Sequence, residues 1–311
     1  MNIFKYDLNS VPVINGVYQF TDDAPIVTEG DGLKWLGYEN VGENYRPNYF
    51  YNKDSDNVGN YINLAEFLGN DKIILDVGAG LGECAISFAL SGLRAIAVDI
   101  SQIMMEAAVK RARKHNVPEE KIIFARMNAY KLELEDNSVD AVLAMDVLHQ
   151  VDRPELIVDE IKRVLKPEGY FLKYGGKNLG FTEEQQKAND YYNSVLKDIE
   201  TFYYNHVSES DYRPFSSWEQ ADKCVKENFV EYKSIDDTGA FWADNIEWSL
   251  KLGLHKLKTR AAGGTQLIPD EVHNGAWAKT DGYAKNKYGE DYENISRFYN
   301  HTSGMVLYKM V

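Results

Sequence analysis

The stretch IILDVGAGLGE, residues 73–83, decides the fold of this chain. Apolar residues run into Asp76, and glycines follow at every second position, at Gly78, Gly80 and Gly82. Glycine suits a backbone that must adopt a positive φ or let a ligand approach closely. A helix that begins here leaves N–H groups free for an electron-rich ligand group. The stretch therefore predicts a buried strand, a tight turn and a helix start beneath a nucleotide-like ligand.

The spacing of these glycines separates two kinds of cofactor. Dinucleotide-binding proteins carry G-x-G-x-x-G, whose third glycine lets the helix pack on the strand. Here the pattern is G-x-G-x-G, and Glu83 stands where the dinucleotide motif has its third glycine. Asp76 adds a negative charge, which disfavours a pyrophosphate and suits a cationic group such as an amino-acid ammonium. An NAD-dependent oxidoreductase is therefore disfavoured.

Further segments repeat the alternation of strand and helix. Strands are predicted at residues 72–77, 94–99, 121–126, 139–145, 170–174, 229–234 and 305–310, and helices at 82–92, 102–116, 153–165 and 216–227. This alternation implies a parallel sheet with right-handed crossovers, and ligands then lie beyond the carboxyl ends of the strands. Asp99 ends the second strand, where a carboxylate can accept both hydroxyl groups of a ribose.

In this order the segments resemble the class I S-adenosylmethionine-dependent methyltransferases, over about residues 70–175. The resemblance implies an α/β fold with a Rossmann-like, seven-stranded, mostly parallel sheet and helices on both faces. It also implies S-adenosylmethionine as the cofactor and S-adenosylhomocysteine as its product. It does not fix the methyl acceptor.

The resemblance also assigns cofactor contacts residue by residue. They are Asp76, Gly78, Gly80, Gly82, Asp99, Ile100, Asn128, Ala129 and Asp146. Asp76 would face the methionine ammonium, Asp99 the ribose and Asp146 the methionine moiety. Many relatives carry Asp where Asn128 stands, but the Asn carbonyl can still accept a hydrogen bond from the adenine amino group. The alternative for the acids is a role in strand-end turns or helix caps.

The chain is longer than this core requires. We expect an N-terminal extension over residues 1–70 and a core over residues 71–311, with insertions at about 176–215 and 240–300. The extension carries Asn15-Gly16 between apolar pairs, a strong hairpin signal. Its Tyr45 and Tyr51 are candidates to cover the cofactor. The insertions are rich in aromatic residues, and we expect them to form a lid that contacts the substrate through Tyr203, Tyr204, Trp242 and Trp248. Packing on the core or in a dimer face is the alternative for these rings.

His149 and His206 are the candidate catalytic bases. His149 follows the strand at 139–145, where a His is common in this family and need not be catalytic, so a place in the cofactor wall is the alternative. The sulfonium is already an activated methyl donor. The protein must align nucleophile, methyl carbon and sulfur, and exclude water. A base is needed only for a nucleophile that must lose a proton.

Composition narrows the class of partner. The chain has 34 Lys and Arg against 48 Asp and Glu, a formal net charge of −14, which disfavours a large nucleic-acid footprint. It lacks an apolar run of about eighteen residues and the apolar core of a signal peptide, so a cytoplasmic protein without a transmembrane helix is expected. Cys84 and Cys224 are too few for a disulfide framework or a zinc site, and no metal is expected.

The sequence therefore predicts a methyltransferase that acts on an O, N or C atom of a small, partly apolar or aromatic molecule. One alternative is an RNA methyltransferase, which the net acidity disfavours. Another is a non-catalytic binding module with the same fold, which the intact glycine turn and Asp99 disfavour. The oligomeric state is left open.

Overall fold

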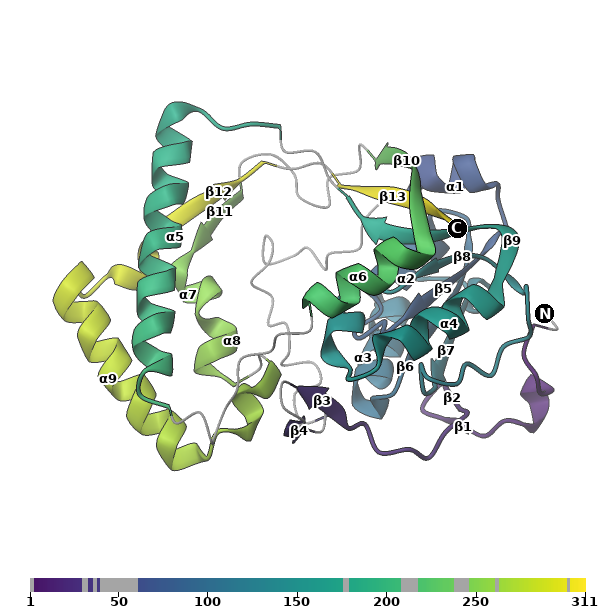
Figure 1. Ribbon diagram of the computed structural model, residues 1–311, viewed down its shortest axis with the longest axis horizontal. Coiled ribbons are helices and arrows are strands. Elements are labelled where there is room, and N and C mark those ends of the chain that lie inside the picture. Colours follow the sequence, from purple (N-terminus) through teal and green to yellow (C-terminus); the bar gives the residue numbers. More distant parts are fainter. Residues whose placement is uncertain are drawn as a thin grey trace.

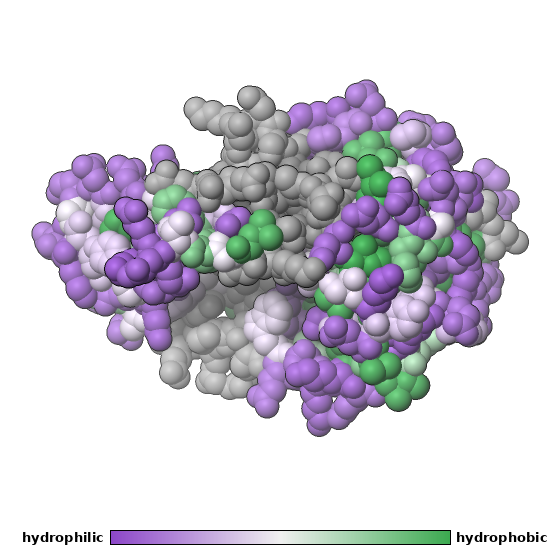
Figure 2. Space-filling view, turned by 90° about the horizontal axis from the view of Figure 1, so that it is seen from above, coloured by the Kyte–Doolittle hydropathy of each residue, from purple (hydrophilic) through white to green (hydrophobic). Residues whose placement is uncertain are grey.

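A computed structural model of the chain describes residues 3–29, 33–35, 38–39, 61–175, 179–207, 218–237, 246–260, 263–300 and 303–311. Figure 1 shows two parts, a twisted sheet with helices on both faces and a mainly helical lobe beside it. On the face that Figure 2 shows, the described residues of both parts are mostly hydrophilic, with apolar residues scattered among them. No helix in these ranges is long and apolar enough to span a membrane.

The main sheet has nine strands within the described residues, in the order β1-β2-β7-β6-β5-β8-β9-β13-β10. Their bounds are β1 (Val13–Ile14), β2 (Val17–Gln19), β5 (Ile73–Val77), β6 (Arg94–Asp99), β7 (Ile122–Arg126), β8 (Val139–Leu143), β9 (Leu165–Tyr174), β10 (Phe229–Asp237) and β13 (Ser303–Met310). Neighbours from β2 to β9 pair in parallel, whereas β1 with β2, β9 with β13 and β13 with β10 pair antiparallel. The predicted Rossmann-like, mostly parallel sheet is confirmed.

The sheet has two strands more than the predicted seven, because the N-terminal hairpin joins it. Asn15 and Gly16 take φ values of 52° and 87°, as a two-residue hairpin turn of this type requires. Strand β2 then pairs in parallel with β7, with Tyr18 opposite Ala125. The Asn-Gly signal predicts the hairpin correctly, but a local turn signal does not say which sheet edge will accept it.

Helices cover both faces of the sheet. On one face lie α1 (Ile62–Leu68), α2 (Glu83–Leu90) and α3 (Gln102–Lys114), and on the other α4 (Pro154–Val164) and α6 (Trp218–Asn228). Side chains of β5 alternate between the two cores, since Ile74 packs with the first group and Leu75 with the second. All five residues of β5 are buried, as in a central parallel strand. Ser101 caps α3 as a good N-cap residue does, because its Oγ accepts the Met104 N–H at 3.3 Å.

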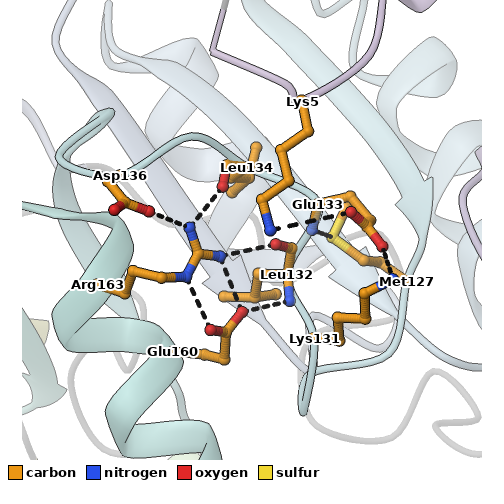
Figure 3. Close-up of polar contacts among 9 residues, drawn as sticks. All are labelled: Lys5, Met127, Lys131, Leu132, Glu133, Leu134, Asp136, Glu160 and Arg163. Atoms are coloured by element: carbon orange, nitrogen blue, oxygen red, sulfur yellow. Dashed lines mark hydrogen bonds and ion pairs between the residues drawn. The ribbon is translucent and has the colours of Figure 1, made fainter.

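The loop between β7 and β8 is held by Arg163 of α4 (Figure 3). Its guanidinium donates to the carbonyl oxygens of Leu132 and Leu134, both at 2.8 Å. Glu160 binds the same guanidinium and also accepts the Leu132 N–H at 2.7 Å. Charge-assisted bonds of this kind are among the stronger ones in proteins. A backbone N–H of the loop also points to Sδ of Met127 at 3.3 Å, which ties the loop to the end of β7.

Strand β9 begins earlier than predicted. The strand predicted at 170–174 starts at Leu165, so that Pro167 and Gly169 lie inside β9. Its pairing with β8 changes register between Val139 and Ala141. The irregularity accommodates a proline, which has no N–H to donate to the ladder.

The second part is a lobe built from both predicted insertions. Its elements are α5 (Glu183–Tyr204), β11 (Ile246–Ser249), α7 (Leu250–Gly253), α8 (His255–Lys258), the 3-10 helix η5 (Gly263–Leu267), α9 (Asp270–Tyr288), η6 (Tyr292–Asn294) and β12 (Ser296–Tyr299). Helix α5 begins with a capping box between Thr182 and Gln185. Asn189 of α5 donates to the Phe298 carbonyl at 3.2 Å and accepts the Phe298 N–H at 2.7 Å. Segments about a hundred residues apart therefore share one core.

A short N-terminal hairpin touches both parts of the molecule. It consists of β3 (Val27–Glu29) and β4 (Leu33–Trp35), which pair antiparallel. Strand β3 contacts the 3-10 helix η4 (Leu148–Gln150), and β4 contacts η5 of the lobe. Two further 3-10 turns, η1 (Leu8–Ser10) and η3 (Glu119–Lys121), complete the described elements.

Candidate functional site

A depression lies at the carboxyl ends of β5, β6, β7 and β8. It encloses about 1260 Å³ when the space open to solvent is included. The predicted cofactor residues that line it are Asp76, Gly78, Gly80, Asp99, Ile100, Asn128, Ala129 and Asp146. Residues from four separate segments thus meet at one edge of a parallel sheet, where ligands of such sheets bind.

The glycine turn forms the floor of this depression. The Gly78 and Ala79 N–H groups donate to the Val98 carbonyl at 2.9 and 3.0 Å, so the turn is tied to β6. Gly78 has a φ of +69°, and a Cβ placed on it would lie 2.7 Å from Cβ of Val147. Gly82 does not line the depression, and its contact with the cofactor stays a prediction. A Cβ there would lie 2.9 Å from Cβ of Ala108, so Gly82 lets α2 pack closely on α3.

Asp99 binds the turn and the start of α3 at once. Its Oδ2 accepts the Gly80 N–H and its Oδ1 the Ser101 N–H, both at 2.9 Å. Burial raises the pKa of Asp99, the charge of Glu39 raises it further, and the backbone N–H groups lower it. Each carboxylate oxygen can accept more than one hydrogen bond, so both keep capacity for a ligand hydroxyl.

Asp76 lies deeper and is only 4% exposed. Burial raises the pKa of Asp76 from its ordinary 3.8 to about 7, and the charges of Asp99 and Glu83 raise it too, while the Ala85 N–H lowers it. A buried carboxyl group that can ionise near neutral pH is suited to receive a cation, because the incoming charge offsets the cost of burial.

We expect this pKa to appear in cofactor binding. A cofactor ammonium pairs only with the ionised carboxylate, so affinity for S-adenosylhomocysteine should rise about tenfold from pH 6 to pH 8. The folding stability of the free protein depends on pH in the opposite direction. Between pH 4 and 7 the folded chain keeps a proton on Asp76 that the unfolded chain releases, so this group lowers stability as pH rises. Titration calorimetry from pH 6 to pH 8 measures the change in affinity for S-adenosylhomocysteine.

Two controls isolate Asp76 in that titration. Asp76→Asn should bind more weakly, with the rise in affinity removed. 5′-Methylthioadenosine, which lacks the amino-acid moiety, should bind the unchanged protein with little dependence on pH. A rise that persists in Asp76→Asn would assign the titration to another group.

The β7 end of the depression contains contacts that the sequence did not indicate. Oδ1 of Asn128 accepts the Tyr130 N–H at 2.9 Å, and its Nδ2 donates to Asp23 at 2.8 Å. Tyr130 also lines the depression and donates to Asp152 at 2.7 Å. Asn128 therefore joins the N-terminal segment to the end of β7. The one signal in the sequence for these contacts is that Tyr130 lies two residues after Asn128.

The N-terminal segment supplies one wall. Pro25, Ile26 and Tyr38 line the depression, and Tyr38 packs against Leu81 and Met104 beside the glycine turn. Aromatic cover from this extension was expected of Tyr45 and Tyr51, and both lie outside the described residues.

Neither candidate base lines the depression. His149 stacks on Trp218 with ring centroids 3.5 Å apart, and burial lowers the pKa of His149 to about 4. Such an imidazole is a weak proton acceptor at neutral pH. His206 is exposed in the lobe, where its Nδ1 lies 2.8 Å from the Phe202 carbonyl oxygen of its own helix. Both residues have local packing contacts in the structure, and their role as bases stays a prediction.

Three of the predicted substrate residues are described, and they lie in the core of the lobe (Tyr203 and Trp248) or against it (Tyr204). Tyr203 is fully buried, with its hydroxyl 2.8 Å from Nδ1 of His273, and Trp248 is 7% exposed. Tyr204 packs edge-on against Tyr203. Trp242 lies outside the described residues. The buried rings of Tyr203 and Trp248 leave little surface for an acceptor, whereas Tyr204 is half-buried and its predicted substrate contact stays a prediction.

Comparison with known proteins agrees with this geometry. A family model described as a methyltransferase domain matches residues 75–172, which span the glycine turn, Asp99, Asn128 and Asp146. Residues 75–172 form a class I S-adenosylmethionine-dependent methyltransferase domain. The predicted family is thereby confirmed, and S-adenosylmethionine is the cofactor of this domain.

Curated relatives match mainly over this methyltransferase domain. A demethylmenaquinone methyltransferase of Clavibacter sepedonicus is 35% identical over 96 residues, covering 31% of this chain and 38% of the relative. The uncharacterized methyltransferase YcgJ of Bacillus subtilis is 32% identical over 119 residues, covering 38% and 46%. The chain thus spans less than half the length of the curated relatives it matches.

The crystal structure of YcgJ covers 80% of this chain and 95% of its own at 19% identity, with a TM-score of 0.44. The strand order and the sequence match over residues 75–172 define the fold of the methyltransferase domain.

Proposed function

We propose that this protein transfers a methyl group from S-adenosylmethionine to a small, partly apolar molecule. The observation that carries this proposal is the meeting of Asp76, the glycine turn and Asp99 in one depression beside apolar side chains. The acids suit two polar groups of the cofactor, the methionine ammonium and the ribose hydroxyls. Apolar surface suited to the adenine of the cofactor comes from Ile100, Ala129 and the neighbouring Met127.

The residues fit the cofactor by their own chemistry. Asp99 keeps hydrogen-bonding capacity beyond its two backbone bonds, and buried Asp76 lacks a cationic partner among the described side chains. The bound cofactor supplies a methyl group already activated on a positively charged sulfur. The protein then has to hold the acceptor in line with that methyl group and exclude water.

We also propose that the helical lobe and the extension cover the acceptor. Support comes from the β3–β4 hairpin, which contacts η4 beside the pocket with one strand and η5 of the lobe with the other. An element that touches both parts can couple closure of the lobe to occupancy of the pocket. The predicted lid is thus kept, but the β3–β4 hairpin, and not the aromatic residues buried in the lobe, links it to the pocket.

Binding of the cofactor product tests the proposed function. At one hundred times its dissociation constant, S-adenosylhomocysteine should stabilise the fold by about 2.7 kcal/mol, a clear increase in Tm. NADH at the same concentration should leave Tm unchanged. A shift with NADH and none with S-adenosylhomocysteine would refute the proposal.

An RNA acceptor is the less favoured alternative. The charged residues that line the described pocket are Asp76, Glu83, Asp99 and Asp146, all acidic. Phosphate contacts require clustered cations and make binding strongly dependent on salt. Tight, salt-sensitive binding of a short single-stranded RNA would reopen this alternative.

A further inference from the structure

The four pocket acids differ in what already binds them. Asp76 is buried and receives the Ala85 N–H. Glu83 lies 3.6 Å from Nη2 of Arg111, and its side chain is 12% exposed. Both carboxylates are therefore held by the protein itself.

Asp99 is likewise bound, by the Gly80 and Ser101 N–H groups. Asp146 is the exception, because its carboxylate makes no hydrogen bond or ion pair with any residue in the described ranges. It is exposed and lines the pocket. Of the four acids, it alone has its full hydrogen-bonding capacity open to a ligand.

The backbone holds Asp146 in a costly conformation. Its φ is +54°, in the left-handed region where residues other than glycine are uncommon and Asp and Asn are better tolerated. The Gln150 side-chain amide donates to the Asp146 carbonyl oxygen. Val147, the next residue, is the one that a Cβ on Gly78 would strike. Asp146 is therefore fixed beside the glycine turn on the β5 and β8 side, away from the Asp99 and Asn128 side.

The charge around Asp146 selects the ligand that it can receive. The described pocket lining contains no Lys, Arg or His, and nearby His149 is uncharged at neutral pH because burial lowers its pKa to about 4, so an anionic acceptor would meet only like charge from these side chains. A cation would gain a charge-assisted bond to the one uncommitted carboxylate.

On this basis, and resting on the proposed methyl transfer, we propose that Asp146 binds the methyl acceptor and that the acceptor is a basic amine. In the transfer, the amine nitrogen forms a bond to the methyl carbon as the carbon–sulfur bond breaks. The electron pair of that bond stays on sulfur, which becomes a neutral thioether. Because a bound ammonium has no free electron pair, it first gives a proton to the Asp146 carboxylate, which passes it to solvent, and the neutral amine then attacks the methyl carbon.

Two cofactor analogues test this role without knowledge of the natural acceptor. S-Adenosylhomocysteine is neutral at sulfur, whereas sinefungin carries a primary ammonium where the S-methyl group stands. Asp146→Asn should weaken sinefungin about tenfold, as expected for loss of one charge-assisted bond. It should change the affinity for S-adenosylhomocysteine less than twofold. Calorimetric titration gives both values.

Two further variants separate the loss of the Asp146 carboxylate from a loss of stability and from a general effect of charge. Asp146→Gly removes the carboxylate and suits the left-handed backbone, so it should lose sinefungin affinity to the same extent without a lower Tm. Glu155→Gln, on the exposed start of α4, removes one charge outside the pocket and should leave both affinities unchanged. Equal weakening of both analogues would assign Asp146 to the cofactor, and no weakening would leave it without this role; either result overturns the proposal. Failure of the unaltered protein to bind S-adenosylhomocysteine would instead overturn the proposed function and this inference together.

Discussion

Asp99→Ala is expected to lower affinity for S-adenosylhomocysteine about ten- to a hundredfold, because charge-assisted bonds to a ribose contribute roughly 1.5–3 kcal/mol. The variant also removes the acceptor of the Gly80 N–H, at 2.9 Å, so the glycine turn loses a bond that shapes it. The affinity of Asp99→Asn should lie between those of the unaltered protein and Asp99→Ala, because its amide oxygen still accepts one N–H but carries no charge. Titration calorimetry measures all three affinities.

A matched control separates the role of Asp99 from a general effect of lost charge. Asp136 is an exposed acid that pairs with Arg163 at 2.7 Å on the loop between β7 and β8. Asp136→Ala should cost at most about 1 kcal/mol of stability and leave affinity unchanged. If Asp99→Ala remains folded and binds as well as the unaltered protein, Asp99 is only part of the turn.

The sheet and the cofactor side of the pocket were largely predictable from local sequence. Strand β5 is central and buried throughout, and the apolar run at 73–75 that begins it identifies it without knowledge of its neighbours. Asp76, Asp99 and Asp146 each follow such a run. The rule that parallel strands end at one edge then brings them together.

Contacts between distant segments could not be predicted in this way. The bond between Asp23 and Asn128 spans 105 residues, and its partners are ordinary polar residues in their own surroundings. Tyr203 and His273 are 70 residues apart and meet inside the lobe. Two insertions rich in aromatic residues have the same composition whether their rings line a pocket or pack against each other. The rings are seen to pack against each other only in the structure, where the two insertions fold together into one lobe.

Gly78→Ala is expected to abolish cofactor binding and to destabilise the fold by roughly 2–5 kcal/mol, from about 1–2 for a left-handed backbone and about 1–3 for overpacking. Its φ is +69°, and the new methyl carbon would lie 2.7 Å from Cβ of Val147. Val147 lines the pocket, so relief of the clash moves this side chain at the expense of the cofactor. Thermal unfolding and titration with S-adenosylhomocysteine measure the two effects.

Two companion variants separate the causes. Gly275→Ala, in the interior of α9, has an ordinary helical backbone and no atom within 4 Å of the added carbon. It should stabilise the protein by up to about 1 kcal/mol without a change in binding. Gly78→Ala combined with Val147→Gly removes the clash but keeps the left-handed strain, so it should recover part of the stability lost in the single variant. Normal binding by Gly78→Ala would mean that the turn can move away from Val147, and that its tight contact with η4 does not shape the cofactor site.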